Sequence, residues 1–156
     1  MAGLVYNRGK QRIAEYFSER TATARDFKCA LVIDNYTPSA DDNLWGDAGV
    51  SSNEIAAGNG YTAGGAAVTS DSTGFPSNTE DDTNDRNDLT MKDVVWTPSG
   101  GPIPASGEGA RWIVLYEDGA TKHLICVWDA EDVLGVGGRI NSTVGITLSG
   151  FKLRIS

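Results

Sequence analysis

The stretch RWIVLYE (residues 111–117), followed by KHLICVW (122–128), decides the fold class. Both segments are apolar at nearly every position, which is typical of strands that are buried on both faces of a sheet. Asp118-Gly119 between them is a turn signal for an antiparallel hairpin. A four-residue loop would place Val114 opposite Ile125, and a two-residue loop would shift that register.

Further strands are indicated by alternation of apolar residues. Residues 27–33 alternate with one strongly apolar face, and residues 66–73 form a weaker candidate. Near the end of the chain, residues 144–148 and 151–155 alternate in opposite phase. The phase slips at Ser149-Gly150, which predicts a bulge or bend between two strands. Many short strands and little helix predict an all-β fold, a β-sandwich or barrel-like domain with long loops.

One helix is expected, over residues 8–20, near the N-terminus. The apolar residues at helical spacing make only a narrow stripe: Ile13, Tyr16 and Phe17. The first turn is basic, which opposes the helix dipole. We therefore expect a short N-terminal helix or arm (residues 1–25) that adds little to the fold, and a single β domain (residues 26–156).

Three polar segments read as loops or turns. Residues 78–88 contain no apolar side chain and predict an exposed loop, and residues 98–109 are rich in proline and glycine. Oxygen-bearing side chains alternate over residues 81–87, as in calcium loops, but the required glycine and the distant glutamate are missing. A solvated loop is therefore the prediction, with bound calcium as the alternative. Ser51 and Glu54 have capping-box spacing, which predicts a single helical turn.

Charge is distributed unevenly along the chain. The net charge is −8, residues 1–20 carry +2, and the remainder therefore carries −10. Between Lys28 and Arg86 there are ten acidic residues and no Lys or Arg. Such a surface repels phosphate backbones, so we expect no direct contact with nucleic acid. The basic residues Arg8, Lys10 and Arg12 could instead contact an acidic neighbouring subunit, and simple solubility is the alternative explanation.

Neither a membrane span nor a secretion signal is expected. No run of about 18 apolar residues occurs. The first residues, 1–5, are too short for the apolar region of a signal peptide, and the basic residues follow them rather than precede them.

Residues with catalytic potential are sparse. His123 lies in an apolar segment without an Asp or Cys pattern, and no Gly-x-Ser-x-Gly motif occurs. Cys29 and Cys126 lie in apolar runs and read as small buried side chains; a disulfide would require neighbouring strands. We therefore expect a protein that is not an enzyme, with no catalytic residue, no metal ion and no cofactor.

The segment GYTAGG (residues 60–65) is unusually rich in glycine beside an aromatic residue, Tyr61. Only glycine adopts positive φ cheaply. We expect Gly64 or Gly65 to adopt such a conformation, or to let another segment or chain approach closely. Tyr61, Gly64 and Gly65 are therefore candidates for a structural or interface motif.

Several segments together resemble a family of small virion proteins of tailed bacteriophages. The segments are Tyr6-Asn7-Arg8-Gly9-Lys10, Tyr36-Thr37-Pro38 with Asp41-Asp42, Asn53-Glu54-Ile55, Gly60-Tyr61-Thr62-Ala63-Gly64-Gly65-Ala66, and Trp112-Ile113-Val114-Leu115-Tyr116. The resemblance touches the whole length, and its specific part covers residues 34–68. It implies a structural role in the particle and brings no catalytic residues.

The resemblance implies a virion structural protein, and within that class we expect a capsid decoration (cement) protein that binds and stabilises the shell. Its expected partners are the major capsid protein, other virion subunits and further copies of itself, in a homo-oligomer such as a trimer. The expected location is the capsid exterior, after synthesis in the host cytoplasm. The alternatives are a tail, neck or baseplate component, and a surface carbohydrate-binding module using Tyr36, Trp45 and Tyr61. A hydrolase is the least supported alternative.

Overall fold

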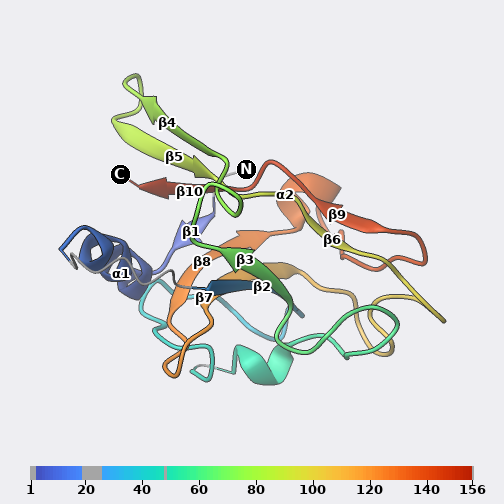
Figure 1. Cartoon of the computed structure of the whole chain (residues 1–156). Helices are drawn as coiled ribbons and strands as arrows, with labels where there is room; N and C mark the ends of the chain where they lie inside the picture. The colour runs from blue at the N-terminus through green and yellow to red at the C-terminus, as the bar shows by residue number, and fades with distance from the viewer. Residues whose placement is uncertain (1–2, 19–25, 48, 156) are drawn as a thin grey trace.

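The computed structural model describes residues 3–18, 26–47 and 49–155 and shows an all-β protein (Figure 1). The strands are β1 (Leu4–Val5), β2 (Asp26–Val32), β3 (Ala66–Thr69), β4 (Ser77–Asp81), β5 (Arg86–Thr90), β6 (Val94–Trp96), β7 (Trp112–Glu117), β8 (Leu124–Asp129), β9 (Ile146–Leu148) and β10 (Lys152–Ile155). The helices are α1 (Asn7–Ser18), α2 (Glu131–Leu134) and the 3-10 turn η1 (Ser51–Asn53). The expectation of an all-β fold is confirmed.

The strands form three open sheets arranged as in a sandwich. The largest sheet has the order β1-β8-β7-β2-β3, the second β10-β5-β4, and the third β6-β9. Figure 1 shows β10-β5 and β6-β9 on one side of the large sheet, with the β4–β5 hairpin projecting from the body. The main core lies between these layers, because it contains side chains of both the large sheet and the smaller ones.

The large sheet is covered on both faces, which explains the continuous apolar runs of its central strands. On β7, Ile113 and Leu115 belong to the main core. The intervening Val114 and Tyr116 belong to a second buried cluster on the other face, to which Tyr36, Trp45 and Val50 also belong. Residues 111–117 and 122–128 were therefore correctly interpreted as central strands.

The register expected for the β7–β8 hairpin is wrong. Val114 pairs with Val127, not with Ile125, and the connection is longer than either of the loops considered. A β-bulge lies where Leu115 pairs with Cys126 but Tyr116 pairs with Leu124. Ile125 is the extra residue, so Ile125 and Cys126 both join the main core. A bulge of this kind does not change the pattern of apolar residues in the sequence, so that pattern does not predict it.

The polar segment 78–88 is not an exposed loop but most of the β4–β5 hairpin. Asp81 and Arg86 close the hairpin with an ion pair of 2.7 Å, and Asn84 donates to Asp81 in the turn. Backbone pairing with β10 extends the sheet. The strand was missed because its side chains are mostly exposed, so no apolar alternation marks it.

The change of phase in the apolar alternation at Ser149-Gly150 does separate two strands. β9 pairs with β6, whereas β10 pairs with β5 in a different sheet. Gly150 between them has a φ of 71°, which accommodates the bend.

The capping-box expectation for Ser51 and Glu54 is corrected. The helical turn is the 3-10 turn η1, and no side chain caps its start.

The N-terminal segment is attached to the large sheet. β1 pairs with β8, and Tyr6 is fully buried. A Cβ at Gly9 would lie 2.9 Å from Cα of Ile125, so α1 packs directly against β8. These contacts conflict with the expectation that residues 1–20 add little to the fold. The side chains of Tyr16 and Phe17 lie outside the described residues.

Candidate functional site

The glycine motif folds back on the large sheet. Gly64 and Gly65 have φ values of 87° and 81°, which confirms the expectation of positive φ. A Cβ at Gly65 would overlap the carbonyl of Cys29 and lie 2.7 Å from Cα of Ala30. The close approach is therefore to β2 of the same chain, where β3 begins to pair.

Glu54 links the two halves of the glycine-rich motif. Its carboxylate accepts hydrogen bonds from Tyr61 Oη at 2.7 Å and from the amide of Gly64 at 2.6 Å. Tyr61 Oη also accepts from the amide of Leu31 on β2. Tyr116 donates to the carbonyl oxygen of Gly64 at 2.8 Å. Burial, with Glu54 nearby, raises the pKa of Tyr61 well above its ordinary value, so the hydroxyl stays protonated as a donor.

A second hydrogen-bonded cluster joins the N-terminal motif to the Tyr-Thr-Pro segment. Tyr36 donates to Asp42 at 2.7 Å, and Tyr6 Oη lies 2.9 Å from Tyr36 Oη. Asn7 donates to Asp41 at 2.9 Å. The segments on which the resemblance was based therefore meet in two hydrogen-bonded clusters. The residues of these clusters link parts of the chain that are distant in sequence.

The aromatic residues proposed for sugar binding are not on the surface. Tyr36, Trp45 and Tyr61 are all buried. Trp45 stacks on Tyr116 with ring centroids 4.4 Å apart. Their assignment to a carbohydrate-binding surface is therefore wrong, because a buried ring offers no face to a sugar.

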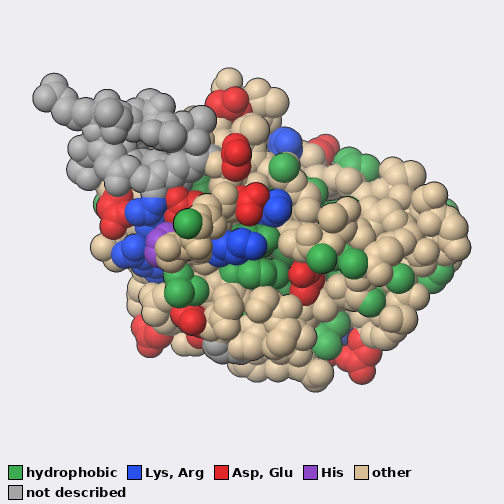
Figure 2. All heavy atoms as spheres, turned by 60° about the horizontal axis from the view of Figure 1, so that its bottom comes forward, with side chains coloured by type: hydrophobic (Ala, Val, Ile, Leu, Met, Phe, Trp, Pro, Cys, Tyr) green, Lys and Arg blue, Asp and Glu red, His purple; other side chains and the backbone are tan. Residues whose placement is uncertain are grey.

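The three basic residues of the N-terminal segment have different environments. Arg12 is nearly buried and donates to both carboxylate oxygens of Glu117, at 2.8 and 3.0 Å. Arg8 contacts His123 and Gln11. Lys10 is exposed. Figure 2 shows Lys and Arg side chains next to the single histidine on this face. Only Arg8 and Lys10 retain enough exposure to contact a neighbour, whereas Arg12 stabilises the fold.

His123 is held in its neutral form. Arg8 Nε donates to His123 Nδ1 at 3.2 Å, which requires that this nitrogen carry no proton. Partial burial and the charge of Arg8 lower the pKa of His123, with Arg12 acting in the same direction and Glu117 and Glu15 opposing it. The histidine therefore joins α1 to the β7–β8 connection.

We expect stability to depend on the protonation of His123. The unfolded chain binds this proton at a pKa of about 6.5, and the folded chain only at lower pH. The free energy of unfolding should therefore fall as the pH decreases below about 6.5, and this contribution should level off once the folded histidine is also protonated. Urea unfolding between pH 7.5 and 5 should show a steeper decline for the wild type than for His123→Gln. Parallel curves would contradict the assignment.

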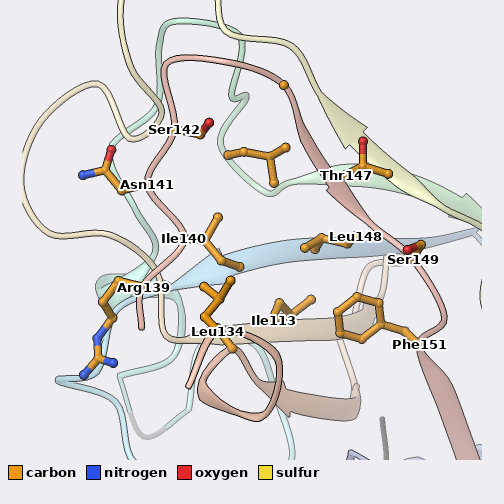
Figure 3. Close-up of a pocket in the computed structure, with 13 residues that line it drawn as sticks. Ile113, Leu134, Arg139, Ile140, Asn141, Ser142, Thr147, Leu148, Ser149 and Phe151 are labelled. Carbon is orange, nitrogen blue, oxygen red and sulfur yellow. The ribbon is translucent and has the colours of Figure 1, made fainter. Parts of the chain in front are cut away.

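A groove lies between the large sheet and β9 (Figure 3). Its volume is about 340 Å³, and its inner wall is formed by Ile113, Ile140 and Phe151, which Figure 3 shows pointing into it. Leu134, which lines the groove, is 53% exposed, and Val144, which directly precedes the lining residues 145–149, is 72% exposed. The sequence does not predict this groove, because the residues that line it lie in short segments without periodicity.

Ion pairs border the groove on one side. Arg139, which lines it, pairs with Asp34 and with Glu131, the latter at 2.7 Å. Arg111 pairs with Asp129 and also with Glu131. Arg139 holds the pKa of Asp34 and of Glu131 below their usual range, so both remain charged.

The two cysteines are buried and unbonded. Cys29 and Cys126 flank Leu115 on adjacent strands, so they lie two strand spacings apart. That is about 9.6 Å, beyond the reach of a disulfide of about 7 Å between Cα atoms. Burial raises the pKa of Cys29 to about 12, so its thiol is protonated and inert at neutral pH.

The described residues lack two kinds of feature. They contain no helix that is long and apolar enough to cross a membrane. They also contain no group of three or more His, Cys, Asp or Glu side chains placed to hold a metal ion. In the segment considered for calcium, Asp81 is engaged by Asn84 and Arg86.

Comparisons of the chain with family models, with curated proteins and with solved structures found no match.

Proposed function

We propose that this protein is a structural component of a tailed-bacteriophage virion, a decoration protein that binds the outside of the capsid shell and stabilises it. The observation that supports this most is the meeting of the resemblance-bearing segments in two hydrogen-bonded clusters. Glu54 joins Tyr61 to Gly64, and Tyr36 joins Tyr6 to Asp42. These residues hold the fold together. A structural subunit contributes its folded shape to a particle, so residues of this kind are expected in such a protein.

The proposed mechanism is binding without turnover. Each copy adds buried area between itself and shell subunits, and the symmetry of the shell repeats the contact many times. Oligomerisation, for instance into trimers at symmetry axes, would increase the avidity further. Because the protein binds the assembled shell, it stabilises that state by mass action. Its acidic surface suits the exterior, away from packaged DNA.

Reconstitution of particles tests this proposal. Particles from a phage lacking the gene for this chain should assemble, but should release DNA at a lower temperature than wild-type particles. Adding the purified protein should restore the wild-type release temperature, and the protein should sediment with the particles at a fixed copy number. If it neither sediments with the particles nor changes the release temperature, the decoration role is wrong.

A further inference from the structure

The groove beside β9 runs along the edge of that strand. Five consecutive residues, 145–149, line it. The side chains of a strand alternate between its two faces, so a groove that contacts five consecutive residues also contacts the strand's backbone. No residue of β6 lines the groove, so this edge is the one remote from β6.

The backbone on this edge of β9 is available for pairing. Among the described residues, β6 is the sole partner of β9 in a sheet, and no backbone hydrogen bond joins residues 145–149 to another segment. An edge strand with unpaired amide and carbonyl groups is a template for a further strand. β9 is flanked by exposed Val144 rather than by the charged or proline residues that usually block such edges.

The shape of the groove suits alternate side chains of an added strand. Ile146 and Leu148 point to the buried face of β9, and Ile113, Ile140 and Phe151 complete an apolar lining. The volume of about 340 Å³ lies at the low end of the range for small-molecule sites, about 300–1,000 Å³. It is therefore better matched to individual side chains of an extended segment than to a whole ligand.

The charged side chains around the groove favour a basic binding partner. Three carboxylates belong to the ion pairs that border it on one side, those of Asp34, Asp129 and Glu131. Only two guanidinium groups, those of Arg111 and Arg139, offset them, which leaves a local charge of −1. The whole chain carries −8, so a second copy would be repelled. A basic partner would be attracted.

We propose that this groove binds an extended segment of another protein, with apolar side chains at every second position and Lys or Arg at its ends. The segment adds as a strand to the free edge of β9 and places its apolar side chains against Ile113, Ile140 and Phe151. This mode of recognition combines backbone hydrogen bonds with pockets for alternate side chains. The proposal goes beyond the proposed function, because it holds for a partner segment of this chemistry in any assembly.

The test is a titration of the full-length, isotope-labelled protein by NMR, with a capped peptide of sequence Lys-Thr-Val-Thr-Val-Thr-Lys as the probe. We expect saturable shifts of the amides of residues 145–149, with a Kd of about 0.1–1 mM, which is typical of a short unstructured ligand. A peptide of the same composition with adjacent valines, Lys-Thr-Thr-Val-Val-Thr-Lys, should bind more weakly. Replacing both lysines with glutamate should also weaken binding, less so at high salt.

Two Val→Asp variants distinguish binding in the groove from binding elsewhere on the β6–β9 sheet. Val144→Asp should weaken binding about tenfold, because Val144 directly precedes the groove-lining residues 145–149 and is already exposed in the free protein. Val95→Asp should leave the affinity unchanged, because Val95 is exposed on β6 but does not line the groove. Unfolding curves of both variants establish that each is folded.

Three results would overturn the proposal. The first is the absence of shifts at residues 145–149 at peptide concentrations of several times 1 mM. The second is equal binding of the alternating and adjacent-valine peptides, which would indicate an unspecific apolar contact. The third is a dependence of the same shifts on protein concentration without peptide, which would identify a second copy as the occupant. None of these results would change the expected attachment to particles.

Discussion

Replacing Gly65 with alanine should lower the free energy of unfolding by about 2–5 kcal/mol. About 1–2 kcal/mol of this arises because an alanine is strained at a φ of 81°. A further contribution of about 1–3 kcal/mol arises because the new Cβ would overlap the Cys29 carbonyl and force β2 and the start of β3 apart. Urea denaturation of the purified variant measures the loss.

Gly107 provides a matched control for this substitution. Its φ is 80°, and a Cβ there would meet no atom within 4 Å. Gly107→Ala should therefore cost only the conformational part, about 1–2 kcal/mol. Gly64→Ala should fall between the two, since the nearest atom to its Cβ is the hydroxyl of Tyr116 at 3.1 Å. Equal losses for Gly65→Ala and Gly107→Ala would show that the close approach to β2 contributes nothing.

Replacing Arg12 with methionine should destabilise the protein by about 2–5 kcal/mol. The substitution removes two hydrogen bonds and an ion pair from the carboxylate of Glu117. The two side chains are only 12% and 7% exposed, so water cannot replace the lost partner well. Thermal and urea unfolding of the variant check this prediction.

Lys10→Met is the control, because it removes the same charge from the same helix at an exposed position. It should change the free energy of unfolding by less than about 0.5 kcal/mol. Adding Glu117→Gln to Arg12→Met should recover part of the loss, because the carboxylate charge that Arg12 offsets in the wild type is then removed. If Arg12→Met is as mild as Lys10→Met, then Arg12 belongs with the surface residues and the N-terminal segment is the separable arm that the sequence suggested.

The fold class could be predicted from the sequence because the main strands are marked by apolar residues. The central strands β7 and β8 bury both faces, and the alternation in β2 and near the C-terminus follows the core. The β4–β5 hairpin could not be predicted in this way, since ion pairs such as that of Asp81 with Arg86 hold it together instead of apolar contacts. The bulge at Ile125 was also hidden, because apolar residues surround it on both sides.

The candidate sites could be predicted in part. The positive φ of Gly64 and Gly65 follows from the density of glycine, but the identity of the segment that approaches them does not. The roles of Arg12 and His123 depend on contacts between residues more than 100 positions apart in the chain. The groove beside β9 is formed by residues from four segments of the chain, so no local sequence pattern predicts it.

The central claim is that this protein sits on the outer surface of a phage capsid. A cryo-electron microscopy map of purified virions, fitted with this structure, tests the claim most directly. We expect density matching the large sheet and the projecting β4–β5 hairpin at repeated positions on the capsid exterior, in contact with shell subunits. Density for the chain on the inner capsid wall against DNA, or on the tail alone, would contradict it.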